Sequence, residues 1–226
     1  MRVAIAGAGK VGRSIAAELL GHGHEVLLID EDASNFRADL SGAEWLQADA
    51  CEISSLEEAR LHTCQVTIAA TGDDKVNLVI SLLAKTEYGV PRVVARVNHP
   101  KNEWLFNEAW GVDVAVSTPR MLSALVEEAV SVGDVVRLME FEQGAANLVE
   151  ITLPPESPVV GKRVADVELP IDTALVTIVR DGRVIVPTSD DPLESGDELL
   201  FVTSAAAEAE LQEIFGAHGL EPTPGS

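Results

Sequence analysis

A glycine-rich hexapeptide near the amino terminus constrains the fold more than any other feature of this sequence. Gly7-Ala8-Gly9-Lys10-Val11-Gly12 follows a short apolar run, Val3 to Ala6, and opens a helical pattern from Lys10 to Leu20. A second apolar run, Val26 to Ile29, then ends in the acidic residue Asp30. A G-x-G-x-x-G sequence between a strand and a helix, with an acid at the end of the next strand, is the fingerprint of a dinucleotide-binding βαβ unit.

Each part of this fingerprint has a physical role. Gly7 permits the tight turn, Gly9 lets a phosphate approach the backbone, and Gly12 allows the helix to pack closely on the strand. The free N–H groups and the dipole at Lys10 favour phosphates. The Asp30 carboxylate accepts hydrogen bonds from both ribose hydroxyls and repels a 2′-phosphate, which disfavours NADP. The alternative is a Rossmann fold that has lost its nucleotide.

The pattern of strand followed by helix continues to about residue 130. Further strands are predicted at Trp45–Ala48, Val66–Ala70, Val93–Val97 and Val112–Val116. Further helices are predicted at Ala33–Leu40, Asp73–Thr86, Lys101–Ala109 and Met121–Val130. A short helix that ends towards Arg60 is predicted to be capped by Ser54 and Ser55. Such alternation predicts an α/β fold, a Rossmann-type doubly wound parallel sheet with helices on both faces. The last helix is apolar on more than one side, which indicates either a subunit interface or a fully buried helix.

A second, smaller α+β domain is predicted after Gly133. Strands are expected at Val135–Phe141, Asn147–Leu153, Thr173–Val179, Val184–Val186 and Glu198–Thr203, with a short helical turn in Gly161–Leu169 and a helix at Ala205–Phe215. Asp181-Gly182 is typical of a hairpin turn. The predicted domains are therefore 1–132 and 133–217, and the Pro- and Gly-containing tail, 218–226, is expected to be disordered.

Three further segments place candidate ligands at the carboxyl edge of the predicted sheet. Asp49 follows the third strand and either contacts the ribose or base or caps a helix. Thr71 and Gly72 follow the fourth strand and are expected to line the nucleotide cleft, while Asp73 or Asp74 caps the next helix. Arg96 is in the fifth strand and either contacts a phosphate or forms an ion pair with one of the many acids.

Composition excludes several classes of function. The 16 basic and 37 acidic residues give a net charge of −21, which opposes binding to nucleic acid or to an anionic lipid surface. We find no residue pattern for a catalytic centre and no metal-ligand spacing among the five histidines. Cys51 and Cys64 are expected to be buried, reduced thiols. No signal peptide and no apolar run long enough to span a membrane are expected, so the sequence predicts a cytoplasmic protein.

The ordered set of these motifs resembles the TrkA/KtrA family, whose members carry domains that regulate potassium conductance (RCK domains). The resemblance rests on GAGKVG, Asp30, Ala48-Asp49-Ala50, Ala70-Thr71-Gly72-Asp73-Asp74 with Asn77, Ala95-Arg96-Val97, Gly111-Val112-Asp113, Ser117-Thr118-Pro119, Val159-Val160-Gly161-Lys162 and Ser195-Gly196-Asp197-Glu198-Leu199. It covers nearly the whole chain, and its two halves correspond to the RCK N-terminal and C-terminal domains.

The resemblance implies a cytosolic regulatory subunit that gates a potassium-translocating membrane subunit, lying at the inner face of the membrane through that partner. A homo-oligomer, either a tetramer or an octameric ring, would bind NAD(H) or ATP/ADP at Gly7 to Val11, Asp30, Thr71, Gly72 and Arg96. Lys10 stands where some relatives have an arginine, so strong selectivity for ATP is not implied. Some relatives bind a cyclic dinucleotide near the hairpin that here contains Arg180, Ile185 and Pro187.

Two other functions remain as alternatives. An NAD-dependent oxidoreductase needs an acid–base group beside the nicotinamide, and the sequence offers none. A nucleotide-sensing transcriptional repressor needs a basic DNA-binding helix, which the acidic composition opposes.

Overall fold

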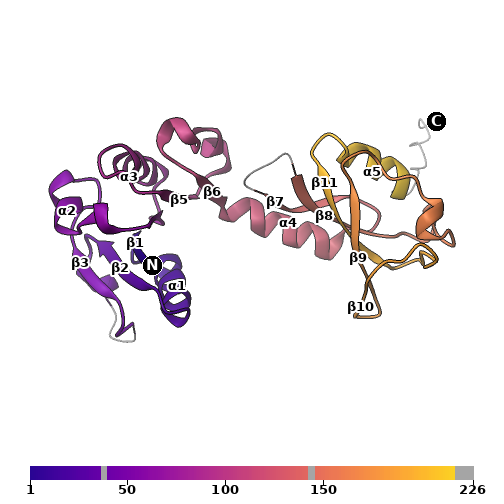
Figure 1. Ribbon diagram of the computed structural model, residues 1–226, viewed down its shortest axis with the longest axis horizontal. Coiled ribbons are helices and arrows are strands. Elements are labelled where there is room, and N and C mark those ends of the chain that lie inside the picture. Colours follow the sequence, from indigo (N-terminus) through magenta and orange to yellow (C-terminus); the bar gives the residue numbers. More distant parts are fainter. Residues whose placement is uncertain (37–39, 142–145, 217–226) are drawn as a thin grey trace, which may run out of the picture. The chain divides into compact units, whose positions relative to one another are not determined.

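A computed structural model gives the architecture of the chain and describes residues 1–36, 40–141 and 146–216 (Figure 1). It divides into two compact units, Met1–Arg120 and Met121–Ser226. The division falls within one helix, α4 (Thr118–Val130), and the boundary predicted at residue 132 lies just beyond the other end of this helix. The assignment of functional domains to 1–132 and 133–217 stays a prediction.

The first unit is built on a parallel sheet of six described strands, as the sequence predicts. The strands are β1 (Arg2–Ala6), β2 (Glu25–Asp30), β3 (Glu44–Gln47), β4 (Val66–Ala69), β5 (Arg92–Val97) and β6 (Val114–Ser117). Their order is β3-β2-β1-β4-β5-β6, so the direction of winding reverses between β1 and β4. In such a sheet a crevice opens at the carboxyl ends of the strands at the reversal point.

Helices cover both faces of this sheet because successive side chains of each strand point to opposite faces. On one face Val3, Ile5 and Leu28 pack with Ala16 of α1 (Lys10–Gly21). The other face forms a separate core, in which Ala4, Ala6, Leu27 and Ile29 pack with Leu56 of α2 (Ile53–Glu58) and with Leu78, Ile80 and Ala84 of α3 (Asp74–Thr86). The doubly wound fold class is therefore confirmed.

The predicted helix Ala33–Leu40 is wrong over the described part of that range. Ala33–Asn35 is a single 3₁₀ turn, and Phe36 is already extended, with φ −71° and ψ 131°. The Asp32 carboxylate accepts a hydrogen bond from Ser34 N, and the Phe36 ring packs against Trp45 with the ring centroids 4.8 Å apart. The aromatic contact with β3 competes with helix continuation, and residues 37–39 lie outside the described residues.

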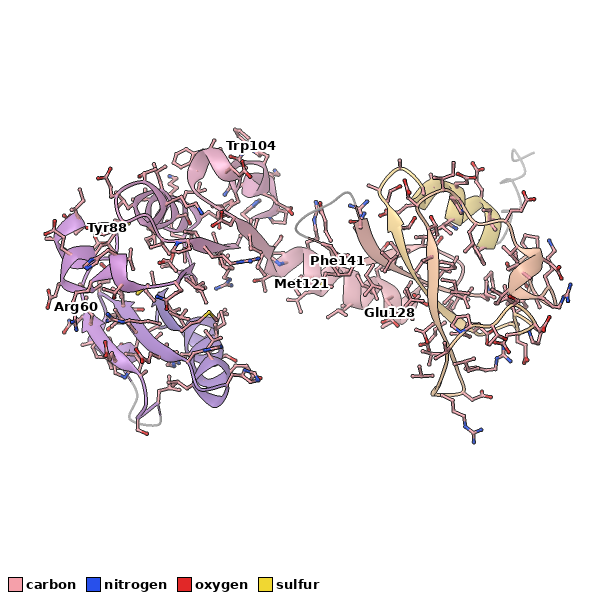
Figure 2. The ribbon with its side chains drawn as sticks, in the orientation of Figure 1. Arg60, Tyr88, Trp104, Met121, Glu128 and Phe141 are labelled. Carbon is pink, nitrogen blue, oxygen red and sulfur yellow. The ribbon has the colours of Figure 1, made fainter. Side chains whose placement is uncertain are left out.

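Two further helix predictions need correction. Lys101–Ala109 is not one helix but two 3₁₀ segments, Pro100–Leu105 and Glu108–Trp110. Phe106, between the two segments, is buried in the core, and the neighbouring Asn107 side chain accepts a hydrogen bond from Ala109 N. Trp104, in the first segment, projects from the surface (Figure 2).

The serine pair predicted to cap α2 does not do so. Helix α2 begins at Ile53, its N-cap position is Glu52, and no side chain caps it.

The second unit contains an antiparallel sheet on which helix α5 (Glu208–Phe215) packs, which confirms the predicted smaller α+β fold. Its described strands are β7 (Val136–Glu140), β8 (Ala146–Thr152), β9 (Ala174–Arg180), β10 (Arg183–Ile185) and β11 (Glu198–Ser204), in the order β10-β9-β11-β8-β7. Phe215 of α5 packs on Phe201 of β11 in the core. The predicted hairpin turn is present, with φ of 50° at Asp181 and 71° at Gly182.

Helix α4 leaves most of its apolar side chains exposed. Only Ala124 is buried, whereas Met121, Leu122, Leu125, Val126 and Val130 are each at least half exposed. Figure 2 shows the side chains along this helix, with Met121 and Glu128 labelled. Of the two predicted environments for this helix, full burial is therefore wrong within the single chain. In the described residues, no helix is both long enough and apolar enough to cross a membrane.

Candidate functional site

A cleft of about 730 Å³ lies at the carboxyl edge of the parallel sheet, where the winding reverses between β1 and β4. Nine of the eleven predicted site residues line it: Gly7, Gly9, Lys10, Val11, Asp30, Asp49, Thr71, Gly72 and Arg96. They come from five places along the chain, at or after the carboxyl ends of β1, β2, β3, β4 and β5. The remaining two predicted residues, Ala8 and Gly12, do not line the cleft, and their role as direct ligands is not supported.

The glycine loop is shaped by backbone requirements. Gly7 has φ of 101°, a conformation that favours glycine, and its N–H donates to the Ile29 carbonyl at 2.8 Å. A Cβ on Gly12 would overlap the carbonyl oxygen of Gly7, so Gly12 serves the packing of α1 on this loop. A Cβ on Gly9 would meet no atom within 4 Å, which leaves the space above the loop open.

The amino terminus of α1 faces this open space without a side-chain cap. Gly9 is the N-cap residue and has no side chain to accept from the first N–H groups of the helix. Those N–H groups and the helix dipole form an anion site of the kind that binds phosphate. Lys10, the first residue of the helix, is exposed and lines the cleft.

Asp30 ties the glycine loop to the segment after β2. One carboxylate oxygen accepts from Ala8 N at 2.6 Å, and the other accepts from Asp32 N at 2.9 Å and from Asn35 Nδ2 at 3.2 Å. The carboxylate is therefore fixed in orientation. Ala8 contributes to the site through this bond, while its side chain is buried.

Asp49 forms a local turn and not a helix cap. Its Oδ1 accepts from Cys51 N at 2.8 Å, and α2 begins only at Ile53. Cys51 also lines the cleft and is half-buried, whereas the sequence predicted a buried thiol; Cys64 is buried as predicted. Burial and the neighbouring Asp49 charge raise the pKa of the Cys51 thiol to about 11, which keeps it neutral and unreactive near pH 7.

The first turns of α3 organise the other side of the cleft. Asp73 caps the helix, accepting from Lys75 N at 2.8 Å and from Val76 N at 3.3 Å. Asn77, fully buried, accepts from Thr71 N at 2.9 Å and from Thr71 Oγ1 at 2.7 Å. Its amide nitrogen donates to the Arg96 carbonyl at 2.8 Å. Asn77 therefore joins two cleft-lining residues that come from separate strands.

Asp74 extends this polar cluster to the loop after β5. It is 7% exposed and accepts from Asn98 N at 2.6 Å, His99 N at 3.0 Å and Asn102 Nδ2 at 2.8 Å. Burial alone would raise the pKa of its carboxyl, but the hydrogen bonds from Asn102, Asn98 and His99 outweigh burial and lower it. Asp74 is therefore a charged anchor for that loop, and Asp73 is the cap.

Arg96 lies at the carboxyl end of β5 and lines the cleft. Its Nε donates to Thr118 Oγ1 at 3.3 Å, and within residues 1–36, 40–141 and 146–216 it forms no ion pair. The alternative role as a partner of an acid is therefore wrong for the described residues. Its positive charge, in the same cleft as the amino terminus of α1, suits the recognition of an anion.

Sequence reasoning missed the organising role of Asn77 and Asp74, and also several residues that line the cleft: Ile29, Glu31, Asn35, Ala48, Ala50, Cys51, Ala70, Asp73 and Val76. Asn77 lies four residues after the cap Asp73, one helical turn into α3, where a buried amide is unusual. The available signal was the helical spacing of Asp74, Asn77 and Ser81, which puts three polar residues on one buried stripe of α3. Among the described residues, no group of three or more His, Cys, Asp or Glu is arranged to hold a metal.

The cyclic dinucleotide site implied by the resemblance lies at the hairpin of the second unit, with Arg180, Ile185 and Pro187. The Arg180 guanidinium is paired with the buried Asp197, at 2.6 Å from Nε and 2.8 Å from Nη2, and also with Glu194. Ile185 packs against the core of the unit. A phosphate would have to compete with two carboxylates for Arg180, and the cyclic dinucleotide site stays a prediction.

Comparison with known families accounts for both units. Residues 3–118 match the TrkA-N domain and residues 148–216 match the TrkA-C domain. The Trk system potassium uptake protein TrkA of Mycobacterium tuberculosis is 61% identical over 215 residues, which cover 95% of this chain and 98% of that protein. The chain belongs to the TrkA family.

Other TrkA relatives differ in length. The Trk system potassium uptake protein TrkA homolog of Methanothermobacter thermautotrophicus is 34% identical, with 92% of this chain and 97% of that protein covered. The homolog of Archaeoglobus fulgidus is 29% identical over 96% of this chain but only 50% of its own length. This chain therefore corresponds to the whole of the shorter TrkA proteins and to about half of the longer ones.

Solved structures support the fold. The GsuK channel bound to NAD superposes with a TM-score of 0.68 at 15% identity, over 97% of this chain and 40% of that one. The GsuK RCK domain superposes with a TM-score of 0.65 at 15% identity, over 95% of this chain and 47% of that one. At this identity the likeness shows the RCK fold of the TrkA chain, and the ligand of GsuK remains a statement about GsuK.

Proposed function

We propose that this chain is a nucleotide-sensing regulatory subunit of a potassium-uptake system. The observation that carries the proposal is the cleft at the carboxyl edge of the sheet. In it an uncapped helix terminus, the fixed Asp30 carboxylate and the Arg96 guanidinium surround an open space of about 730 Å³. Membership of the TrkA family supplies the physiological setting, uptake of potassium by a membrane partner.

An adenine nucleotide, NAD(H) or ATP/ADP, fits the chemistry of the cleft. Its phosphates would lie at Gly9, Lys10 and Val11, where backbone N–H groups are free to donate. Asp30 would accept from a ribose hydroxyl through Oδ2, which accepts from Ala8 N and keeps one lone-pair site for a ligand, whereas Oδ1 already accepts two bonds. Glu31 also lines the cleft, and together these acids disfavour a ligand with a 2′-phosphate.

Thr71, Gly72, Arg96 and Asp49 would complete the site from the other strands. Arg96 would contact a phosphate, while Thr71 and Gly72 form the opposite wall. Asp49 would contact the ribose or base, which its place in the cleft allows.

We infer that the nucleotide acts as a signal and not as a substrate. Tyr88, the single tyrosine of the chain, donates its hydroxyl to the Ile53 carbonyl at 2.8 Å and is not among the residues that line the cleft. The thiol of Cys51 is held neutral. The side chains around the cleft thus favour binding of phosphate and ribose over acid–base chemistry on a nicotinamide.

The exposed apolar face of α4 supports a homo-oligomer. Met121, Leu122, Leu125, Val126 and Val130 would be buried between copies of the chain, because a contiguous apolar surface of this kind is unfavourable in water. A tetramer or octameric ring beneath the membrane partner would place the chain in the cytoplasm, at the inner face of the membrane. The net charge of −21 favours a partner surface that is basic.

Isothermal titration with ATP, ADP, NAD⁺, NADH and NADPH, combined with light scattering of each complex, tests the proposal. We expect tight binding of at least one adenine nucleotide, weak binding of NADPH, an oligomer whose dimensions change with the ligand, and no consumption of NADH. A monomer that binds only NAD(H), and oxidises it when offered small carbonyl substrates, would support the oxidoreductase instead.

A further inference from the structure

A side-chain hydrogen bond links the start of α4 to the cleft. Thr118 is the first residue of α4 and directly follows β6. Its hydroxyl accepts from Arg96 Nε at 3.3 Å, and Arg96 itself lines the cleft. The guanidinium of Arg96 thus contacts α4 on one side and the space expected for the ligand on the other.

The backbone of Arg96 is held in place independently of this contact. Asn77 Nδ2 donates to the Arg96 carbonyl at 2.8 Å, and Arg96 pairs with Val116 in the β5–β6 ladder. The buried amide of Asn77 also binds Thr71 on the opposite wall. Movement of Arg96 is therefore confined to its side chain.

The guanidinium has capacity for a second partner. In the part of the chain that the structure describes, the Nη1 and Nη2 groups of Arg96 form no hydrogen bond, so both remain available to a phosphate. The neighbouring Ser117 Oγ is buried and has no partner among the described residues. The β6–α4 junction therefore has hydrogen-bonding groups that a ligand or an ordered water can satisfy.

We propose that Thr118 is a positioning residue for the nucleotide: it orients Arg96 towards the phosphates, and through the same bond phosphate binding stabilises the first turn of α4. The inference rests on the nucleotide function proposed above and deepens it. Coupling between sites is reciprocal, so if the Thr118 bond raises the affinity for the nucleotide, nucleotide binding stabilises the start of α4 by the same free energy. Helix α4 carries the apolar face proposed for assembly, which gives the signal a route from ligand to oligomer.

The test compares Thr118→Val and Thr118→Ala with the matched control Thr118→Ser in the full chain. Both hydroxyl-free variants are expected to bind ADP and NAD⁺ about three- to tenfold more weakly, because the ligand must then order the Arg96 side chain itself, whereas Thr118→Ser binds as the wild type does. Adenosine, which lacks phosphate, is expected to bind all four proteins equally. A structural defect would weaken adenosine as well.

Hydrogen exchange of the α4 amides supplies the second readout. ADP is expected to slow exchange at residues 120–124 in the wild type and in Thr118→Ser, but not in Thr118→Val or Thr118→Ala. The inference would be overturned if both hydroxyl-free variants kept the wild-type affinity for ADP, or if they lost affinity for adenosine to the same extent. It would also be overturned if ADP did not change the exchange rates of the α4 amides in the wild type. A wild-type chain that binds neither ADP nor NAD⁺ would overturn the proposed function together with the inference.

Discussion

Gly9 and Gly12 of the glycine loop have different roles, and substituting each by alanine distinguishes ligand approach from packing. A Cβ on Gly12 would overlap the Gly7 carbonyl oxygen, whereas a Cβ on Gly9 would point into open space. We expect Gly12→Ala to lower the free energy of unfolding by about 3 kcal/mol or more, because rigid backbone must move to admit the methyl group. Gly9→Ala is expected to fold normally but to bind nucleotide at least about tenfold more weakly, because the methyl group occupies the approach of the phosphates.

Chemical denaturation and nucleotide titration of the two variants check this prediction. Each serves as the control for the other, since both add one methyl group to the same loop. If Gly12→Ala were as stable as the wild type, or if Gly9→Ala bound nucleotide normally, the division of roles between packing and ligand approach would be wrong.

At the scale of single residues, sequence reasoning identified half of the lining of the cleft, because those residues lie at or directly after the ends of strands. Parallel strands bring their carboxyl ends to one edge, so Asp30, Asp49 and Thr71 meet there whatever the intervening loops do. Asn77 and Thr118 were not recognised as part of the site, since their contribution depends on distances between side chains. The same holds for Cys51, whose place in the cleft follows from the turn at Asp49.

At the scale of elements, α3 holds two strand ends together through Asn77. Replacing this buried amide by alanine removes the bonds to Thr71 and Arg96 and leaves the Arg96 carbonyl without its side-chain donor. We expect Asn77→Ala to lower the free energy of unfolding by about 2 to 4 kcal/mol and to weaken nucleotide binding. Lys75→Ala, an exposed substitution in the preceding turn, is expected to change stability by less than about 0.5 kcal/mol.

Thermal unfolding with and without ADP measures both effects of the Asn77 substitution. A variant that melts with the wild type, or that loses stability but retains full ADP affinity, would show that Asn77 does not organise the site.

The β8 strand of the second unit carries a carboxyl group that makes the stability of the protein depend on pH. Glu150 is 3% exposed, and burial, with the negative charges of Glu128 on α4 and Glu198 on β11, raises its pKa to about 7 despite a hydrogen bond from Thr152. Between its ordinary value of 4.5 and about 7, the folded state holds a proton that the unfolded state releases. This contribution to stability is therefore complete below about pH 4.5 and is lost as the pH rises through 7.

Glu150→Gln tests this dependence, because glutamine keeps the acceptor for Thr152 but cannot ionise. We expect the unfolding free energy of the wild type to fall by about 1 to 3 kcal/mol more than that of the variant between pH 5 and pH 8. Glu156→Gln removes the same charge at an exposed position of the same unit and is expected to keep the wild-type slope. Parallel slopes for Glu150→Gln and the wild type in urea titrations would contradict the assignment.

Elements with a strong apolar period were predicted well, and weakly patterned ones were not. All six strands of the parallel sheet and the long helices α1, α3 and α4 follow from buried runs and amphipathic spacing. The segments Ala33–Leu40 and Lys101–Ala109 failed because aromatic side chains decide their course: Phe36 packs on Trp45, and Phe106 turns into the core. Such tertiary contacts override local propensity and cannot be seen in the spacing of residues.

At the scale of the whole molecule, the question is what covers α4. Its exposed side chains Met121, Leu122, Leu125, Val126 and Val130 lie on one side of the helix at 100° per residue, and Glu127 lies on the opposite side. A chain with net charge −21 repels its own copies, so association needs an apolar surface large enough to overcome that repulsion. The side of α4 that bears Leu125 is the surface in the described chain that best meets this need.

Leu125→Lys is therefore expected to weaken self-association by about tenfold or more, since a buried contact of one leucine contributes about 1.5 to 3 kcal/mol and an unpaired charge costs more. Glu127→Lys, a larger change of charge on the opposite side of the same helix, is expected to leave association intact or to strengthen it by reducing repulsion. Sedimentation velocity across a range of concentrations measures both variants. If Leu125→Lys and the wild type assembled alike while nucleotide titration remained normal, the oligomer would have to be built on another surface, and the route from Arg96 through Thr118 to assembly would fail although the nucleotide site stands.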